Sequence, residues 1–246
     1  QTLSKHHQHF DLAVLIPHYH NLSGLKRSLG SIETRKKVIV VVVDDGSVEP
    51  PLIHENESQS YEIAFIFNEC NLGIERTLNK GLTFIKDNYK IPYIARVDCG
   101  DIMVNSRLDK QVRYLEQNID IDLVGSWVEF FNKKGSLFKL RLPTGYQAVR
   151  KKMMLTVCLI HPAVMFRSII IDKLGLYPLD FPAAEDYAYF MKIVNEAKAE
   201  NIPEVLTKVE YNDKGISMSL RHIQLNSRLK VVWKYRRLSV YFLLGI

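Results

Sequence analysis

The chain has 246 residues, and its 33 Lys and Arg against 27 Asp and Glu give a formal charge of +6. Seven of the basic residues follow Asp213 and no acidic residue does, so residues 1–213 carry 26 basic and 27 acidic side chains. A near-neutral body with a basic tail argues against a nucleic-acid-binding domain and favours a local contact surface.

Composition and cysteine usage set further limits. A hydrophobic content of 47% with 24% charged residues is typical of a globular protein and excludes a disordered, collagen-like or coiled-coil chain. The length suits one large α/β domain or two small ones. Three widely spaced cysteines form no disulfide framework or zinc-binding pair, which favours a reducing, cytoplasmic compartment. Residues 1–11 are polar and rich in His, and we expect them to be disordered or derived from an expression vector.

Predicted strands and helices alternate over the first hundred residues. The run of six β-branched residues at Val38–Val43 predicts a strand buried on both faces, as in a parallel sheet. The expected order is strand Leu12–Pro17, helix Leu22–Ile32, strand Val38–Val43, strand Tyr61–Phe67, helix Ile74–Ile85 and strand Tyr93–Val97. This order predicts an α/β fold with a doubly wound, mostly parallel sheet flanked by helices.

The second half of the chain is less regular. Its predicted elements are helix Arg107–Gln117, strand Leu123–Phe131, helix Tyr187–Ala197, strand Val205–Tyr211 and a helix from about Leu220. His161-Pro162 predicts a break inside Met153–Phe166, before a further strand. Because no repeat or linker separates these elements, we expect one domain over residues 12–220 and a basic, aromatic helix over residues 221–246.

Two acidic clusters follow predicted strands, and ligands of doubly wound sheets bind beyond the carboxyl ends of the strands. Asp44 and Asp45 precede Gly46, and a carboxylate there can accept a hydrogen bond from a ligand N–H group or a sugar hydroxyl. The alternative is a turn in which these carboxylates bond only local backbone. Asp98 and Asp101 are spaced to converge on one Mg²⁺ or Mn²⁺ ion, unless Asp101 merely caps the next helix.

A third acidic pair, Glu185 and Asp186, opens a predicted helix, where stabilisation of the helix dipole would also place acids. His161 is a single histidine in an apolar stretch, which is more typical of a hydrogen-bonded core residue than of a ligand. The chain has no GxxxxGK[ST] or GxGxxG phosphate loop and no GxSxG nucleophile elbow.

Six segments in order carry a more specific signal: VLIPHYHNLSGLKRSLGSI, VVVDDGS, NLGIERTLNKGL, YIARVDCGDIM, HPAVMFR and AEDYAYFMKI. Together they resemble the family-2 glycosyltransferases with a GT-A fold, over about Leu12 to Arg221. The match is closest to bacterial members that build lipo-oligosaccharide, lipopolysaccharide O-antigen or capsule chains. The resemblance implies a nucleotide-binding half followed by an acceptor-binding half. It also implies sugar transfer from a nucleotide-sugar, with UDP expected, to a saccharide or lipid-linked acceptor.

The resemblance assigns the donor side of the site. Pro17 and Tyr19 would meet the nucleotide base, and Asp45, with Asp44 beside it, would hold the uracil or the ribose. The segment along the nucleotide and its diphosphate would contribute Asn71 and Arg76, and Asp98 would open the DxD element.

The acceptor side is assigned in the same way. Asp186, with Glu185 before it, matches the acidic motif whose Asp is the general base of an inverting displacement. His161 would lie near the acceptor, while Arg221 and His222 would close on the diphosphate. A divalent cation, Mn²⁺ or Mg²⁺, would offset the diphosphate charge together with Arg or Lys.

Gly100 departs from the family pattern, because it stands where the second, metal-binding Asp of Asp-x-Asp-Asp is expected. The metal would then depend on Asp98, Asp101 or water, or metal binding would be weak or absent. Two other functions stay open at this point. A nucleotidyltransferase shares the layered architecture but needs a glycine-rich loop with a lysine after the first strand. A degenerate, non-catalytic family member could serve a membrane assembly.

The C-terminal tail is also open to two interpretations. Residues 225–246 interleave basic side chains with aromatic and aliphatic ones, a pattern that suits a helix lying on an anionic membrane surface. The other interpretation is a helix that packs on the domain with a solvated basic face, or a dimer contact. A peripheral position on the inner face of the plasma membrane would suit a lipid-linked acceptor.

Overall fold

The structure is a computed structural model that describes residues 9–51, 61–211 and 221–235. Most of the predicted N-terminal segment 1–11 and the end of the predicted tail helix lie outside the described residues. No helix within the described ranges is long and apolar enough to cross a lipid bilayer.

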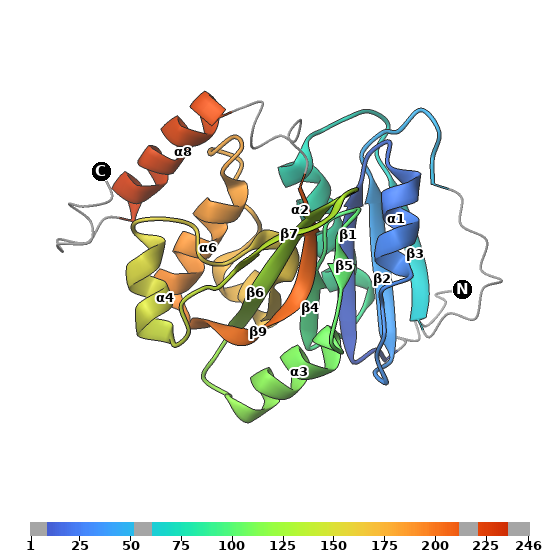
Figure 1. Ribbon diagram of the computed structural model, residues 1–246. Helices are drawn as coiled ribbons and strands as arrows, with labels where there is room; N and C mark the ends of the chain where they lie inside the picture. The colour runs from blue at the N-terminus through green and yellow to red at the C-terminus, as the bar shows by residue number, and fades with distance from the viewer. Residues whose placement is uncertain (1–8, 52–60, 212–220, 236–246) are drawn as a thin grey trace, which may run out of the picture.

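One mixed sheet organises the chain, in the strand order β3-β2-β1-β4-β8-β6-β9-β5, with β7 beside β6 (Figure 1). The strands are β1 (Leu12–His18), β2 (Val38–Asp44), β3 (Tyr61–Phe67), β4 (Tyr93–Arg96), β5 (Ile102–Met103), β6 (Leu123–Asn132), β7 (Gly135–Leu140), β8 (Met165–Arg167) and β9 (Ala199–Glu210). The helices are α1 (Leu22–Leu29), α2 (Ile74–Asn88), α3 (Arg107–Gln117), α4 (Tyr146–Met153), the short 3₁₀ turn η1 (His161–Ala163), α5 (Ile169–Leu174), α6 (Glu185–Glu196) and α8 (Arg221–Lys234).

The first half of the sheet is parallel, as the sequence predicts. Strands β3, β2, β1 and β4 are parallel neighbours, with His18 opposite Asp44 at the ends of β1 and β2. The second half is mixed, because β8 runs antiparallel to both β4 and β6 while β9 is parallel to β6. The sheet is therefore parallel over β3, β2, β1 and β4 and mixed over its other strands.

Both faces of β1 and β2 are buried, which explains why these strands are apolar at every position. Leu12, Val14 and Ile16 face a core that contains residues of α1 and α3. Ala13 and Leu15 face a second core, which contains residues of α2, α4 and α6. Helices on both faces close the sheet, so ligands reach the strands only at their ends.

Four elements are absent from the sequence-based prediction, and each lacks a strong periodic signal. β5 has two residues and α5 has six. β7 is largely exposed and α4 buries only Val149 and Met153. β9 begins at Ala199, before the predicted Val205, because the strand continues across an irregularity that contains Pro203.

Candidate active site

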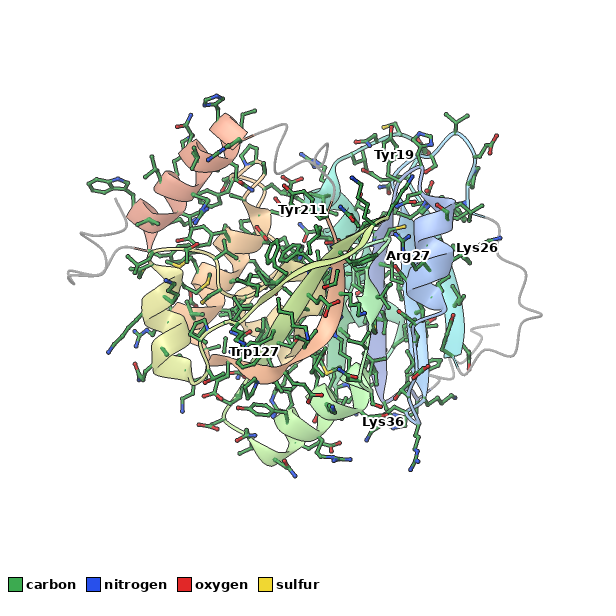
Figure 2. All side chains as sticks on the ribbon, viewed as in Figure 1. Tyr19, Lys26, Arg27, Lys36, Trp127 and Tyr211 are labelled. Atoms are coloured by element: carbon green, nitrogen blue, oxygen red, sulfur yellow. The ribbon has the colours of Figure 1, made fainter. Side chains whose placement is uncertain are left out.

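The ends of β1, β2 and β4 form one edge of the parallel half-sheet. Pro17 is buried within β1, while Tyr19 follows it at this edge and is 48% exposed. Tyr19 and Lys36 mark opposite ends of the strands in Figure 2. A hollow of about 720 Å³ opens at the edge and is lined by His18, His20, Leu22, Val48, Glu49 and Pro50. Its volume is in the range of small-ligand sites.

Asp44 fixes the ends of β1 and β2 to each other. Its carboxylate accepts hydrogen bonds from Nδ1 of His18 at 2.6 Å and from the backbone N and Oγ of Ser47 at 2.9 and 2.7 Å. Because the amide of Asn21 donates to Nε2 of His18, the ring proton lies on Nδ1 and points at Asp44. Burial raises the pKa of Asp44, but the hydrogen bonds from Ser47 and His18 outweigh it and leave the pKa below its ordinary value. Asp44 therefore anchors the strand ends.

Asp45 holds the loop between β3 and α2. Its Oδ1 accepts from Nδ2 of Asn68 at 2.8 Å and from the amide of Leu72 at 2.9 Å, and its Oδ2 accepts from the amide of Gly73 at 3.0 Å. This loop carries Asn71, which is exposed, and leads into the first turn of α2, where Arg76 is exposed. The structure thus brings Asp45 to the predicted nucleotide segment, through the loop's backbone amides.

Gly46 allows this loop to lie against the turn after Asp44 and Asp45. Its φ is +77°, and a Cβ at this position would lie 2.7 Å from Cα of Cys70. Only glycine combines this backbone conformation with so close an approach of a second chain segment.

Asp98 follows β4 and forms an ion pair with Arg96, the last residue of that strand. Nη2 of Arg96 lies 2.5 Å from Oδ1 of Asp98, and the arginine is 1% exposed whereas the aspartate side chain is 42% exposed. Burial raises the pKa of Asp98, but the charge of Arg96 outweighs it and lowers the pKa below its ordinary value. Asp98 is therefore an ionised carboxylate at the mouth of the site.

The residues of the turn 98–101 do not fit the predicted metal site. Gly100 supplies no ligand, and Asp101 is 3% exposed with its Oδ1 bonded to the amide of Glu210 at 2.8 Å. Burial, and then the charge of Asp98, raise the pKa of Asp101 well above its ordinary value. No group of three or more His, Cys, Asp and Glu side chains within the described ranges is arranged to hold a metal ion. Asp101 is a buried link to β9 through Oδ1, an arrangement that does not favour the predicted pairing of Asp98 and Asp101 as metal ligands.

Glu185 and Asp186 form the first turn of α6. Oδ1 of Asp186 accepts a hydrogen bond from the amide of Tyr187 at 2.6 Å, which fixes the carboxylate over the helix N-terminus. Glu185 is 8% exposed, and its Oε2 has no hydrogen-bond partner among the described residues. Burial, followed by the charge of Asp186, raises the pKa of Glu185 to about 8. Burial also raises the pKa of Asp186 above its ordinary value.

Charged groups from both halves of the fold converge on Asp186. After burial and its own backbone hydrogen bond, the charges that act on its pKa are those of Asp98, Arg228 and Arg96. The guanidinium of Arg228, on α8, lies 5.1 Å from the ring centre of Tyr187. The structure therefore brings Asp98 and Asp186, which are 88 positions apart in the sequence, into one electrostatic cluster with two arginines.

His161 lies close enough to this cluster for the charges of Arg96 and Asp98 to act on its pKa. Its Nε2 lies 2.9 Å from the hydroxyl of Tyr177, and its ring packs edge-on against Phe190. Burial, with Arg96 as the next cause, lowers the pKa of His161 to about 3, so the ring is neutral. His161 is the hydrogen-bonded buried histidine that its apolar sequence context favours, and it also lies within electrostatic range of Asp98.

The basic residues predicted to close on the diphosphate lie at the start of α8. Arg221 and His222 are both exposed there, and residues 212–220 before them lie outside the described residues. Arg228, two turns further along the helix, is an arginine of α8 whose charge acts on the pKa of Asp186. The roles of Arg221 and His222 at the diphosphate stay predictions.

Sequence reasoning missed Arg96, Tyr177 and Arg228. A signal for Arg96 exists, because a charge at the end of an otherwise apolar buried strand requires a partner. Tyr177 lies in an irregular segment, and Arg228 is one of several basic residues in the tail. Neither of these two has a sequence pattern that separates it from its neighbours.

Comparisons with known protein sequences identify glycosyltransferases as the relatives of this chain. The family model for glycosyl transferase family 2 matches residues 13–175. An uncharacterized glycosyltransferase of Methanocaldococcus jannaschii is 32% identical over 232 residues, which cover 89% of this chain and 78% of the relative. The amylovoran biosynthesis glycosyltransferase AmsE of Erwinia amylovora is 28% identical over 217 residues, covering 83% of this chain and 79% of the relative.

Solved structures share the fold. TarS residues 1–349 of S. aureus, in complex with UDP-GlcNAc, aligns with a TM-score of 0.67 at 19% identity and covers 92% of this chain and 65% of that one. A mannosyltransferase of Pyrobaculum calidifontis, in complex with GDP-Man and Mn²⁺, aligns with a TM-score of 0.65 at 15% identity and covers 92% and 64%. At these identities the likeness concerns the GT-A fold.

Proposed function

Because this chain belongs to glycosyl transferase family 2, we propose that it moves a sugar from a nucleotide-sugar, most simply a UDP-sugar, to a hydroxyl group of a saccharide or lipid-linked saccharide. The observation that carries the proposal is the acidic end of β4, where Asp98 pairs with Arg96 at 2.5 Å, together with the effect of the Asp98 charge on the pKa of Asp186 at the start of α6. Relatives that make surface polysaccharides, such as the amylovoran enzyme, favour an acceptor of that class.

The proposed reaction is a single displacement with inversion at the anomeric carbon. The acceptor hydroxyl attacks that carbon, its proton passes to a carboxylate oxygen of Asp186, and the bond to the nucleoside diphosphate breaks. A base pKa raised toward the working pH favours proton transfer, and burial of Asp186 acts in this direction. The guanidinium of Arg228, which lies beside Tyr187, would offset the negative charge that develops on the diphosphate.

The donor would lie along the edge formed by β1 and β2. Tyr19 is exposed there for contact with a base, and Asp45 orders the loop that carries Asn71. His161 and Tyr177 would shape the acceptor side of the site, where the neutral ring of His161 adds no charge.

A screen of UDP-, GDP- and dTDP-sugars tests the proposal. The full chain is incubated with each donor, with and without a lipid-linked saccharide, and release of nucleoside diphosphate is measured. We expect release from one nucleotide class, and NMR of the product should show inversion of the anomeric configuration. A retained configuration would contradict the single displacement, and failure to bind or cleave any donor would contradict the proposal as a whole.

A second function, that of a non-catalytic family member, is favoured by Gly100 in the place of a metal-binding Asp. The same screen separates the two, because a non-catalytic protein would bind a nucleotide without releasing product. The lack of a glycine-rich loop with lysine after β1 weighs against a nucleotidyltransferase.

We also propose that α8 contacts an anionic membrane surface. The helix buries Ser227, Val231 and Val232 and contains no acidic residue. Exposed apolar residues at four-residue spacing form a stripe that we call the α8 stripe, made of Leu225, Leu229 and Trp233. A helix with an apolar stripe beside basic residues suits the interface of a bilayer with anionic lipids.

A further inference from the structure

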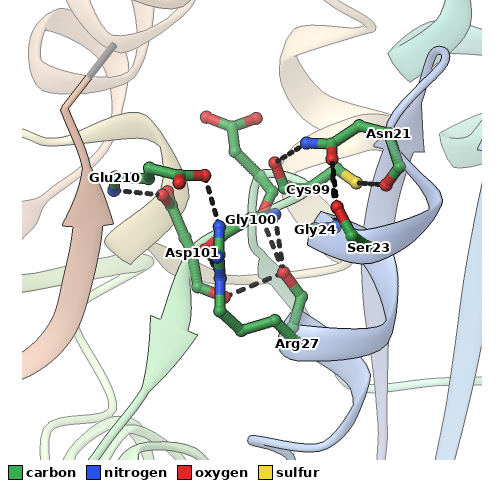
Figure 3. A network of polar contacts seen from close by, with 10 residues as sticks. Asn21, Ser23, Gly24, Arg27, Cys99, Gly100, Asp101 and Glu210 are labelled. Carbon is green, nitrogen blue, oxygen red and sulfur yellow. Dashed lines mark hydrogen bonds and ion pairs between the residues drawn. The ribbon is translucent and has the colours of Figure 1, made fainter. Parts of the chain in front are cut away.

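Three elements from distant parts of the sequence meet at Gly100, in the turn after β4. Arg27 comes from α1 and Glu210 ends β9, and both surround Gly100 in Figure 3. Nε of Arg27 donates to the carbonyl oxygen of Gly100 at 2.8 Å, and its guanidinium forms an ion pair with the Glu210 carboxylate. The same guanidinium lies 5.6 Å from the ring centre of Phe131.

The ion pair occupies the space that a side chain at position 100 would need. A Cβ built on Gly100 would lie 2.6 Å from Oε2 of Glu210 and 3.1 Å from Nη2 of Arg27. The φ of Gly100 is +114°, a conformation that side-chain-bearing residues rarely adopt. An aspartate at this position would therefore have to displace Arg27, Glu210 or the turn itself.

The other carboxylates of the turn also have partners, although Oδ2 of the buried Asp101 has none among the described residues. Asp98 pairs with Arg96 at 2.5 Å, and Asp101 bonds through Oδ1 to the amide of Glu210. Arg96 is thus paired with Asp98, and Arg27 with Glu210. The two positive and two negative charges around the turn 98–101 therefore nearly cancel. A divalent cation entering here would have to displace these two guanidinium groups from the carboxylates with which they are paired.

We propose that this chain binds its nucleotide-sugar without a divalent cation, and that the Arg27–Glu210 ion pair takes the structural place of the metal. The pair ties α1, the turn 98–101 and β9 together at the donor end of the sheet. Arg27 is in this view a positioning residue, because it holds the turn that presents Asp98. The inference rests on the proposed function, since it concerns how the donor is held.

Nucleotide binding by the full chain tests the inference without relying on turnover. UDP and GDP are titrated calorimetrically in EDTA and then in Mn²⁺, and free Mn²⁺ is followed by electron paramagnetic resonance. We expect a Kd that differs by less than about twofold between the two conditions. Binding that is more than about tenfold tighter in Mn²⁺ would overturn the inference alone. Absence of binding under both conditions would overturn the proposed function with it.

Variants of neighbouring basic residues on α1 test the role of the ion pair. Arg27→Ala should weaken nucleotide binding by about tenfold, in EDTA and in Mn²⁺ alike, because the turn loses the Arg27 hydrogen bond to Gly100 and the ion pair with Glu210. The bonds from Ser28 to the turn and from the amide of Glu210 to Asp101 remain. Lys26→Ala is the matched control, since Lys26 is an exposed cation on the same turn of α1 with no part in this network (Figure 2), and it should bind as the wild type does. Should Arg27→Ala fail to fold, Arg27→Lys, which keeps the charge but not the planar fork, should show a smaller loss in the same direction. Wild-type affinity in a folded Arg27 variant would overturn the role of the pair.

Discussion

At the scale of single residues, the environment of Asp186 matters as much as its place in a motif. Its carboxylate is oriented by the amide of Tyr187, and burial raises its pKa. Its neighbour Glu185 is buried, whereas Asp186 is half-buried, and burial raises the pKa of Glu185 to about 8. Asp186 is the one of the pair that is suited to act as a base.

Asp186→Asn removes the proposed base while keeping the size of the side chain. We expect kcat to fall by about 100-fold or more, because the acceptor hydroxyl loses its proton acceptor, with little change in nucleotide affinity. Product formation and calorimetric titration of nucleotide check both parts. Asp87→Asn, an exposed change in the last turn of α2, is the control. Turnover like that of the wild type in Asp186→Asn would contradict the assignment.

The raised pKa of Glu185 predicts that the stability of the fold depends on pH. Its pKa rises from 4.5 in the unfolded chain to about 8 in the fold, so the folded state binds the proton more tightly. This contribution is complete below pH 4.5 and is lost as the pH rises through 8. Glu185→Gln stays neutral, and its Tm should exceed that of the wild type by several degrees at pH 9 but not at pH 5. Glu196→Gln, at the far end of α6, should show no such difference between the two pH values.

At the scale of elements, the carboxylates after β2 fix loops in place. Asp44 joins the end of β1 to the turn after β2, and Asp45 holds the loop before α2. The sequence predicts that these two carboxylates lie at the end of a strand, because they directly follow a buried apolar run. Their hydrogen-bond partners lie up to 28 positions away in the chain. Which groups each carboxylate binds therefore depends on how the strands are paired.

Removal of the Asp44 carboxylate should destabilise the fold. Asp44→Ala leaves His18 and the amide of Ser47 without their buried acceptor, and we expect a loss of about 2 kcal/mol in the free energy of unfolding. Urea unfolding followed by circular dichroism measures the loss. Ser47→Ala removes one of the three hydrogen bonds to Asp44 and the bond that Oγ accepts from the amide of His20, and it should cost less because the Asp44 carboxylate keeps its other two donors. An Asp44→Ala protein as stable as the wild type would contradict the anchoring role.

At the scale of the whole molecule, the candidate site exists only where the two halves meet. The parallel half supplies Asp98 and Arg96, while α6 and α8 supply Asp186 and Arg228. α8 faces the site with one side and exposes the α8 stripe on another. This placement would let a membrane surface and the site share one end of the molecule, which suits a lipid-linked acceptor.

Membrane contact through the α8 stripe is tested by sedimentation with lipid vesicles. The wild type should sediment with vesicles that contain anionic lipid and stay in the supernatant with neutral ones. Leu225→Gln together with Leu229→Gln should reduce binding by about tenfold, because two apolar side chains no longer enter the interface. The control changes the exposed Ile119 and Leu137 to Gln, which lie outside α8. Equal sedimentation of both double variants would contradict the proposal.

The sequence by itself determined the parallel half of the fold, the acidic residues at its strand ends and the family. These features are local, because hydrophobic runs define the strands and the polar residues next to them in the chain mark the strand ends. Only the tertiary structure decided how the charges around the turn after β4 are paired, because several of their partners are distant in the chain. Arg27 and Glu210 are 183 positions apart and Asp101 and Glu210 are 109 apart, yet these contacts close the corner where Gly100 replaces the expected aspartate. Pairing over such distances is a property of the assembled sheet and has no signature in any one segment.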